Sequence, residues 1–166
     1  MEFKGAAVKL GDNINTDFII SGRYKFSITD INELAKHIME DIDPEFPKKI
    51  SPGASILVAG KNFGMGSSRE QAPLVIKASG IVAVLAQSFA RIFFRNAFNI
   101  GLLLIETDTS RISERDSLSI DLDRGVVRNF TTAEELKIKP LPSVMQEFLK
   151  EGGVIPFIKK HGELKI

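Results

Sequence analysis

The segment Asn62-Phe-Gly-Met-Gly-Ser-Ser-Arg-Glu70 brings two glycines, two hydroxyls and a guanidinium together in one short stretch. Gly64 and Gly66 allow positive φ angles and a close approach of the backbone to a neighbour. Backbone N–H groups freed by such a loop, together with the positive end of a following helix, attract an anion. Arg69 adds a planar guanidinium that suits a carboxylate. These residue types in this order therefore predict an anion site.

The two serines are candidates for the N-cap of the helix that follows. Ser67 or Ser68 in that position, with Glu70 or Gln71 three residues later, forms a capping box. Pro73 is best tolerated near the first turn of a helix, so it favours a start no earlier than Ser67. The sequence therefore predicts a helix N-terminus at the serines.

Other motifs fit this glycine segment poorly. A dinucleotide fingerprint needs a third glycine after Gly64-Met-Gly66 and an acidic residue for the ribose, and neither stands out. A P-loop needs Lys followed by Ser or Thr, and a nucleophile elbow needs Gly-x-Ser-x-Gly, so the segment matches neither pattern. A plain glycine turn followed by a helix cap, without chemistry, remains open from the residues alone.

Three short, continuously apolar runs flank the segment, as expected of strands buried on both faces of a sheet. They are Ser55–Ala59, Ile81–Ala86 and Leu102–Ile105. Helical patterns over Arg69–Ser79 and from Ser88 to about Asn99 separate them, and each of these helices is followed by a glycine. This order predicts a βαβαβ parallel core with right-handed crossovers. The glycine segment then lies at the carboxyl edge of the sheet, where ligands bind in such folds.

The first part of the chain is less regular. Phe3–Leu10 favours a strand, and Gly11–Asp17 is a polar loop rich in turn residues. Thr29 or Asp30 can cap a helix that runs to about Met39. Residues 18–28 and 43–49 have no clean period, and no element is predicted there.

The last part of the chain changes character. Residues 118–122 alternate and turn into 126–128, which predicts an antiparallel hairpin. Helices are expected over 141–150 and 154–160. We therefore expect a single α/β domain over residues 1–166, with a parallel core and antiparallel accessory strands.

Composition excludes several classes of protein. The 166 residues carry a net charge of +1, which provides no electrostatic footprint for nucleic acid or an anionic membrane. The absence of cysteine excludes a disulfide scaffold, a thiolate nucleophile and a cysteine-ligated iron–sulfur cluster held by this chain alone. His37 and His161 lie far apart in sequence and make a poor metal set. We expect a soluble, cytoplasmic protein.

Three separated motifs resemble one family. They are Lys61-Asn-Phe-Gly-Met-Gly-Ser-Ser-Arg-Glu-Gln-Ala72, Gln87-Ser-Phe-Ala-Arg-Ile-Phe-Phe-Arg-Asn-Ala-Phe-Asn-Ile-Gly101, and Asn13-Ile-Asn-Thr-Asp-Phe-Ile-Ile20 with the nearby Gly22-Arg23-Tyr24. In this order they resemble the small subunits of 3-isopropylmalate dehydratase and homoaconitase, which are similar to the C-terminal domain of aconitase. The resemblance implies a swivelling β/β/α domain of the aconitase type.

The resemblance also implies an activity. It points to the small subunit of a hydro-lyase that isomerises 2-isopropylmalate and 3-isopropylmalate by dehydration and rehydration in leucine biosynthesis. No cofactor is expected on this chain, and a [4Fe–4S] cluster is expected on a large subunit. The substrate is a small dicarboxylate or tricarboxylate; neither nucleic acid nor membrane is an expected partner. Homoaconitase or a related methyl-substituted malate dehydratase is an alternative, and a stand-alone organic-acid-binding module is an alternative from another class.

Residue roles follow from the same resemblance. Ser67 resembles the base, an alkoxide that removes the proton α to a carboxylate. Ser68 and Arg69 resemble its support and the contact with a substrate carboxylate. Arg23 resembles a second carboxylate-binding arginine.

The segment after Arg23 is expected to contact the variable group of the substrate. Tyr24, Lys25 and Phe26 are its candidate substrate-binding residues, offering both an apolar contact and a cation. Arg91 and Arg95, four residues apart on one predicted helix face, are compatible with the site, a subunit interface or structural salt bridges, and are not assigned a role.

Overall fold

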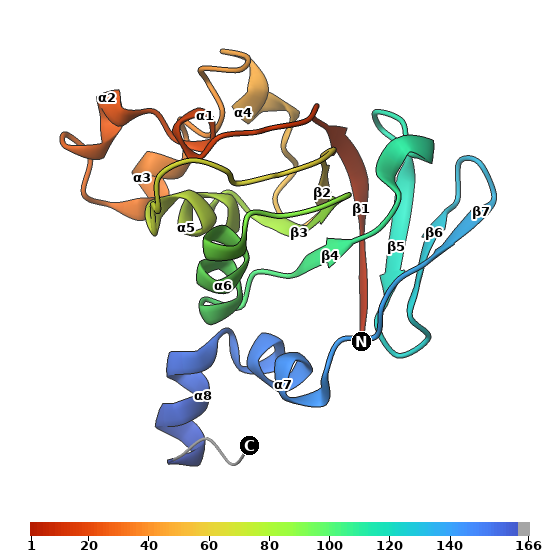
Figure 1. The fold of residues 1–166 in the computed structure, drawn as a ribbon. Coiled ribbons are helices and arrows are strands. Elements are labelled where there is room, and N and C mark those ends of the chain that lie inside the picture. Colours follow the sequence, from red (N-terminus) through yellow and green to blue (C-terminus); the bar gives the residue numbers. More distant parts are fainter. Residues whose placement is uncertain (163–166) are drawn as a thin grey trace.

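The computed structural model describes residues 1–162, except for the side chain of Lys25. The centre of this part of the chain is a seven-stranded mixed sheet with the order β4-β3-β2-β1-β5-β6-β7 (Figure 1). The strands are β1 (Glu2–Lys9), β2 (Ser55–Val58), β3 (Ile81–Ala86), β4 (Leu104–Glu106), β5 (Ser117–Asp121), β6 (Val126–Asn129) and β7 (Glu134–Lys137).

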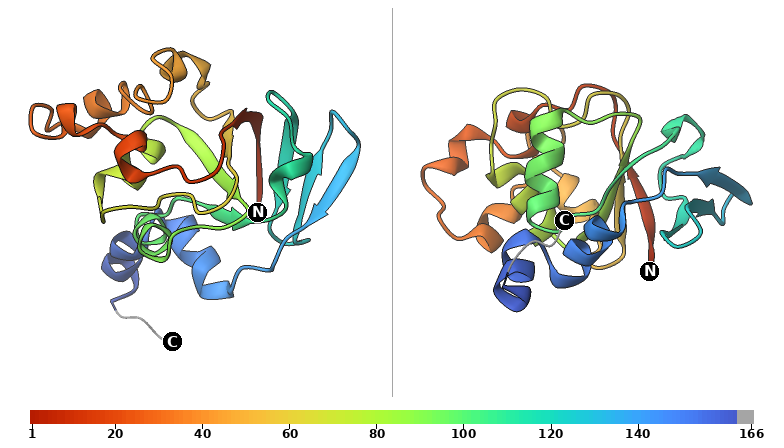
Figure 2. Two further views of the ribbon diagram at one scale, coloured as in Figure 1. Left: turned by 45° about the horizontal axis from the view of Figure 1, so that its top comes forward. Right: turned by 60° about the horizontal axis from the view of Figure 1, so that its bottom comes forward.

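Short helices connect and flank these strands. They are α1 (Thr16–Ile19), α2 (Gly22–Lys25), α3 (Ile31–Ala35), α4 (Phe46–Lys49), α5 (Gln71–Ala78), α6 (Arg91–Asn99), α7 (Ser143–Glu151) and α8 (Val154–His161), with a 3₁₀ turn over Thr109–Arg111. Figure 2 shows α1 to α5 on one side of the molecule and β5 to β7 on the opposite side.

The predicted βαβαβ core is confirmed. β2, β3 and β4 pair in parallel, and α5 and α6 form the two crossovers between them. β1 extends this parallel half, because Ala6 to Lys9 pair with Ser55 to Val58 of β2. β1 also begins the antiparallel half by pairing with β5, where Glu2 faces Asp121. The predicted hairpin is β5 and β6, and β7 adds a strand that the sequence did not predict.

Side chains alternate across the strands and form two apolar cores. Leu57 and Val84 belong to a core with side chains of α1, α3, α5 and α6 on one face of the sheet. Ile56 and Leu85 belong to a second core on the other face, which includes side chains of β5, β6 and β7. The antiparallel strands therefore curl over one face of the parallel core, and the helices close the other.

The predicted capping box at the start of α5 is wrong. The helix begins at Gln71 with Glu70 at the N-cap, and no side-chain hydrogen bond caps it. Pro73 explains the late start, since a helix capped at Ser67 or Ser68 would place it beyond the first turn, where its backbone N–H is needed. In the observed helix Pro73 is the third residue, where no N–H partner is required.

The predicted start of this second crossover helix at Ser88 is also wrong. α6 begins at Arg91, and the Ser88 hydroxyl instead accepts a hydrogen bond from the backbone N–H of Asn62 at 2.8 Å. The predicted helix from Asp30 is shorter than expected. Asp30 does cap α3, but Met39 has a φ of +55° and its N–H donates to the Ile19 carbonyl rather than within a helix.

Candidate active site

Three separated segments meet at the carboxyl edge of the parallel strands. The glycine segment (residues 62–70) forms isolated parallel bridges with both of its neighbours, Met65 with Asn15 and Phe63 with Phe89. The backbone N–H of Gly64 donates to Ile14 at 2.8 Å, which adds to the first of these contacts. The three motifs of the sequence therefore lie together in space.

The two glycines of the segment are required by their neighbours as well as by their backbone angles. Gly64 has a φ of +80°, and a Cβ added there would lie 2.2 Å from a ring carbon of Phe93 in α6. Gly66 has a φ of +96°, and an added Cβ would lie 2.6 Å from Oδ1 of Asn15. The segment therefore packs closely against both neighbours immediately before the two serines.

Ser67 is exposed and fixed through its backbone. Its carbonyl oxygen accepts a hydrogen bond of 2.9 Å from the hydroxyl of Thr16, which is buried. Within residues 1–162, neither the Ser67 hydroxyl nor the Ser68 hydroxyl has a hydrogen-bond partner. Both hydroxyls are therefore available to a ligand.

Arg69 is held beside the serines by the loop before α1. Its guanidinium forms an ion pair with Asp17, and Nη1 also lies 3.5 Å from the Ile20 carbonyl oxygen. The Arg69 side chain is 17% exposed, compared with 51% for that of Asp17. The guanidinium is thus partly buried and oriented, which favours a directional contact with a carboxylate.

A hollow of about 340 Å³ lies between the glycine segment and α6. Its wall includes the three predicted residues Ser67, Ser68 and Arg69. The remaining lining residues are Thr16, Gly64, Gly66, Ala90, Arg91, Ile92, Phe93 and Asn96. The two arginines are the charged residues of this wall, so an anionic ligand is favoured there.

Arg23 does not line this hollow. Its guanidinium forms an ion pair with Asp41, and its Nε donates to the Ser21 hydroxyl at 3.3 Å. The backbone of α2 is nevertheless close to the site, since a Cβ added to Gly22 would lie 4.0 Å from Nη1 of Arg69. The structure thus brings α2 next to the site while the Arg23 guanidinium contacts Asp41.

The other residues predicted to contact the variable group also lie outside the hollow. The Tyr24 hydroxyl donates to Glu40 at 2.8 Å, and its ring stacks on His37 with the ring centroids 3.9 Å apart. Glu40 raises the pKa of Tyr24 by accepting this hydrogen bond, and burial adds to the effect. Phe26 is 88% exposed. The Lys25 side chain is outside the part of the chain that is described.

Several residues that shape the site were not predicted. Thr16 and Asp17 position Ser67 and Arg69, while Arg91 and Asn96 line the opposite wall. Thr16 and Asp17 belong to the predicted polar loop, but only the fold shows which groups they contact. The helical spacing of Arg91 and Arg95 marked α6 without distinguishing between them.

Comparison with known proteins identifies the family. Residues 14–110, which include all three motifs apart from Asn13, match the Aconitase C-terminal domain family. The 3-isopropylmalate dehydratase small subunit 2 of Archaeoglobus fulgidus is 53% identical over 166 residues, covering 100% of both chains. The 3-isopropylmalate dehydratase small subunit of Nautilia profundicola is also 53% identical, covering 94% of this chain and 93% of its own. The chain belongs to the 3-isopropylmalate dehydratase small-subunit family.

A solved structure of the same family has the same fold. The crystal structure of 3-isopropylmalate dehydratase from Methanocaldococcus jannaschii superposes with a TM-score of 0.92 at 46% sequence identity. The match covers 98% of this chain and 96% of that one. The predicted aconitase-type fold is therefore confirmed.

The donor set of this family member does not fit an iron–sulfur cluster. Such clusters are held by cysteine thiolates, and the sequence contains no cysteine. Among the described residues, no group of three or more His, Asp or Glu side chains is placed to hold a metal ion.

Within residues 1–162, no helix has the length and apolar character required to cross a membrane.

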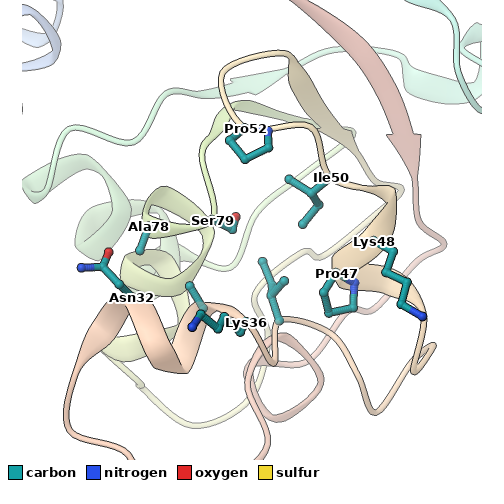
Figure 3. A pocket seen from close by; sticks show the side chains of 10 residues that line it. Asn32, Lys36, Pro47, Lys48, Ile50, Pro52, Ala78 and Ser79 are labelled. Carbon is teal, nitrogen blue, oxygen red and sulfur yellow. The ribbon is translucent and has the colours of Figure 1, made fainter.

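A second hollow, also about 340 Å³, lies between α3, α4 and the end of α5 (Figure 3). Its walls include the apolar side chains of Ile38, Pro47 and Ile50. The two lysines at this hollow, Lys36 and Lys48, form ion pairs with glutamates of their own turns, and Figure 3 shows Lys48 pointing away from its centre. None of the predicted site residues lines this second hollow.

Proposed function

We propose that this chain is the small subunit of a hydro-lyase that interconverts 2-isopropylmalate and 3-isopropylmalate in leucine biosynthesis, and that it acts only with its large subunit. The observation that carries the proposal is the exposed Ser67 hydroxyl, which has no hydrogen-bond partner within residues 1–162 and lies beside Arg69 in a hollow that no acidic side chain of the same residues lines. The names of the relatives supply the substrate. We further propose a single swivelling domain over residues 1–166 and a cytoplasmic location.

Ser67 acts as the base in this proposal. Its alkoxide takes the proton from the carbon α to a carboxylate, the electrons of that C–H bond form the double bond, and the neighbouring carbon releases its hydroxyl as hydroxide. The proton taken up by Ser67 and this hydroxide together make the one water that dehydration releases. Rehydration in the opposite orientation gives the isomer. A [4Fe–4S] cluster on the large subunit would act as the Lewis acid for the departing hydroxyl.

The environment of Ser67 must stabilise a negative oxygen. No histidine lines the described wall of the hollow, so positive charge and backbone N–H groups have to stabilise the serine alkoxide. The partly buried Arg69 is the nearest predicted source of that charge, and docking of the large subunit would exclude water and strengthen its effect. Ser68, the next residue, would support the same bound carboxylate.

Arg23 and the residues after it complete the substrate contacts in this proposal. Arg23 would bind the second carboxylate after exchanging its contact with Asp41, which is an exposed pair of low stability. Tyr24, Lys25 and Phe26 would contact the isopropyl group. The position of Gly22 beside Arg69 supports this arrangement, because a small movement of α2 would bring the segment over the hollow.

Reconstitution with the large subunit tests the proposal. We expect the chain alone to be inactive and the anaerobically assembled complex to hydrate the unsaturated dicarboxylate intermediate. Ser67→Ala should abolish turnover and leave assembly intact, whereas Ser68→Ala, the matched control at the adjacent exposed serine, should retain measurable turnover. Turnover of Ser67→Ala near that of the wild type would assign the base elsewhere. Tight calorimetric binding of malate by the chain alone would favour an organic-acid-binding module.

A further inference from the structure

α6 places a second guanidinium at the Ser67 hollow. Arg91 is the first residue of α6 and lines the hollow opposite the glycine segment. The preceding residue fixes this position, since the backbone N–H of Ala90 donates to the Phe63 carbonyl at 2.9 Å. The start of α6 is therefore hydrogen-bonded to the segment that carries Ser67.

The two arginines of the hollow differ in what they already bind. Arg69 is paired with Asp17 and approaches the Ile20 carbonyl, so part of its guanidinium is occupied. Arg91 has no ion pair or hydrogen bond from its side chain anywhere in residues 1–162, and no Asp or Glu lines the hollow. Arg91 therefore presents its whole fork of donors to an incoming ligand, which is the geometry that carboxylates bind best.

We propose that Arg91 is a substrate-binding residue that holds the carboxylate next to the reacting carbon of the 2-hydroxy diacid. The inference rests on the proposed function. A base that removes a proton α to a carboxylate must have that carboxylate beside it, and Ser67 shares its hollow with Arg91 rather than with Arg23. A carboxylate bound there lies between the guanidiniums of Arg69 and Arg91. The second carboxylate of the substrate is left for Arg23.

Arg95 provides a matched control on the same helix. It lies one turn after Arg91, is likewise exposed, and has no side-chain partner among the described residues, but it does not line the hollow. Replacing either arginine removes one positive charge from the same helix face. Any difference between the two variants therefore reports the position of the guanidinium and not the net charge of the surface.

The test compares Arg91→Ala, Arg91→Lys and Arg95→Ala in the assembled complex. We expect Arg91→Ala to raise KM and to lower kcat, with a loss of about tenfold or more in kcat/KM, because negative charge builds up on the bound carboxylate as the neighbouring carbon loses its proton. Arg91→Lys should lie between this variant and the wild type, and Arg95→Ala should match the wild type. Titration of each variant with the large subunit should give unchanged affinities.

Two results would overturn the inference. One is an unchanged kcat/KM for Arg91→Ala; the other is a weakened affinity for the large subunit with a normal kcat/KM at saturation, which would place Arg91 in the interface. Because the side chains of Arg91 and Arg95 are exposed, all variants should fold. If Arg91→Ala does not fold, the kcat/KM of Arg91→Lys still tests the inference. An inactive wild-type complex would contradict the proposed function itself. Malate binding by the wild-type and Arg91→Ala complexes, measured by calorimetry, would then decide the role of Arg91.

Discussion

The buried hydroxyl of Thr16 donates a hydrogen bond of 2.9 Å to the carbonyl oxygen of Ser67. The backbone N–H of Thr16 also donates to the Met65 carbonyl at 2.9 Å. One residue at the start of α1 thus contacts the glycine segment twice and determines where the candidate base lies. The position of Ser67 depends on a residue far from it in sequence.

Replacement of Thr16 should affect turnover more than stability. Thr16→Val keeps the shape of the side chain and removes the donor, so we expect a loss of about 1 kcal/mol in the free energy of unfolding. Displacement of Ser67 should reduce kcat by about tenfold, since catalysis is sensitive to small misplacements of a base. Thr16→Ser, which keeps the hydroxyl, should stay near the wild type. Denaturant unfolding and steady-state kinetics measure both effects, and a normal kcat for Thr16→Val would contradict this role.

Added side chains in the glycine segment should destabilise it in a graded order. Gly64→Ala places a methyl group 2.2 Å from the ring of the buried Phe93, whereas Gly66→Ala places one 2.6 Å from the terminal amide oxygen of Asn15, which can move only by giving up its hydrogen bond from the Asp17 N–H. Both positions also have positive φ angles, which cost about 1 kcal/mol for alanine. We therefore expect Gly64→Ala to be the more destabilising, by about 3 kcal/mol or more.

Gly11→Ala is the control for these two variants, because an added Cβ there meets no atom within 4 Å and the φ angle is not positive. In thermal unfolding, we expect Gly11→Ala to have the highest melting temperature of the three variants, Gly66→Ala an intermediate one and Gly64→Ala the lowest. A Gly64→Ala protein as stable as the wild type would show that the segment does not pack against α6 as described.

The ionisation of Tyr24 should be shifted and directly visible. Tyr24 is the one tyrosine of the sequence, which has no tryptophan, so ultraviolet absorbance of the phenolate reports this residue alone. Its hydrogen bond to Glu40 raises its pKa above the ordinary value of 10.0. The resulting stabilisation is complete below pH 10.0 and is lost as the pH rises through the higher pKa of the folded state.

Glu40→Ala should return the midpoint of that titration towards 10.0, because the acceptor and the neighbouring charge are both removed. Glu33→Ala, which removes an exposed carboxylate paired with Lys36, should leave the midpoint unchanged. An unshifted midpoint in the wild-type protein would show that the contact between Tyr24 and Glu40 is not maintained in solution.

The parallel core could be predicted from the sequence because its signals are local. Three apolar runs separated by helical patterns give β2, β3 and β4 directly, and glycines mark the ends of α5 and α6. The two helix starts were predicted wrongly for different reasons. Ser88 accepts a hydrogen bond from the distant Asn62 instead of capping α6, and α5 starts late because Pro73 must lie in its first turn. β7 was missed because Glu134–Lys137 gains its partner only from β6.

The candidate site shows the same contrast between features with a local sequence signal and features that depend on the fold. Ser67, Ser68 and Arg69 could be assigned from a contiguous motif, and the structure places all three on one hollow. Their roles stay predictions, as does the role of Arg23, whose guanidinium contacts Asp41. Arg91 could not be separated from Arg95 by helical spacing, because only the packing of α6 against the glycine segment determines which of them reaches the hollow.

The central position of β1 has a consequence for how the protein folds as it is made. β1 is synthesised before either of its neighbours in the sheet, and its antiparallel partner β5 follows only after the whole βαβαβ unit. Pairing of such distant segments requires closure of a long loop, which slows folding. A nascent chain can therefore pair one edge of β1 with β2 but keeps the other edge unpaired on the ribosome, and we expect release of β5 from the exit tunnel to be the event that commits the sheet to its final order.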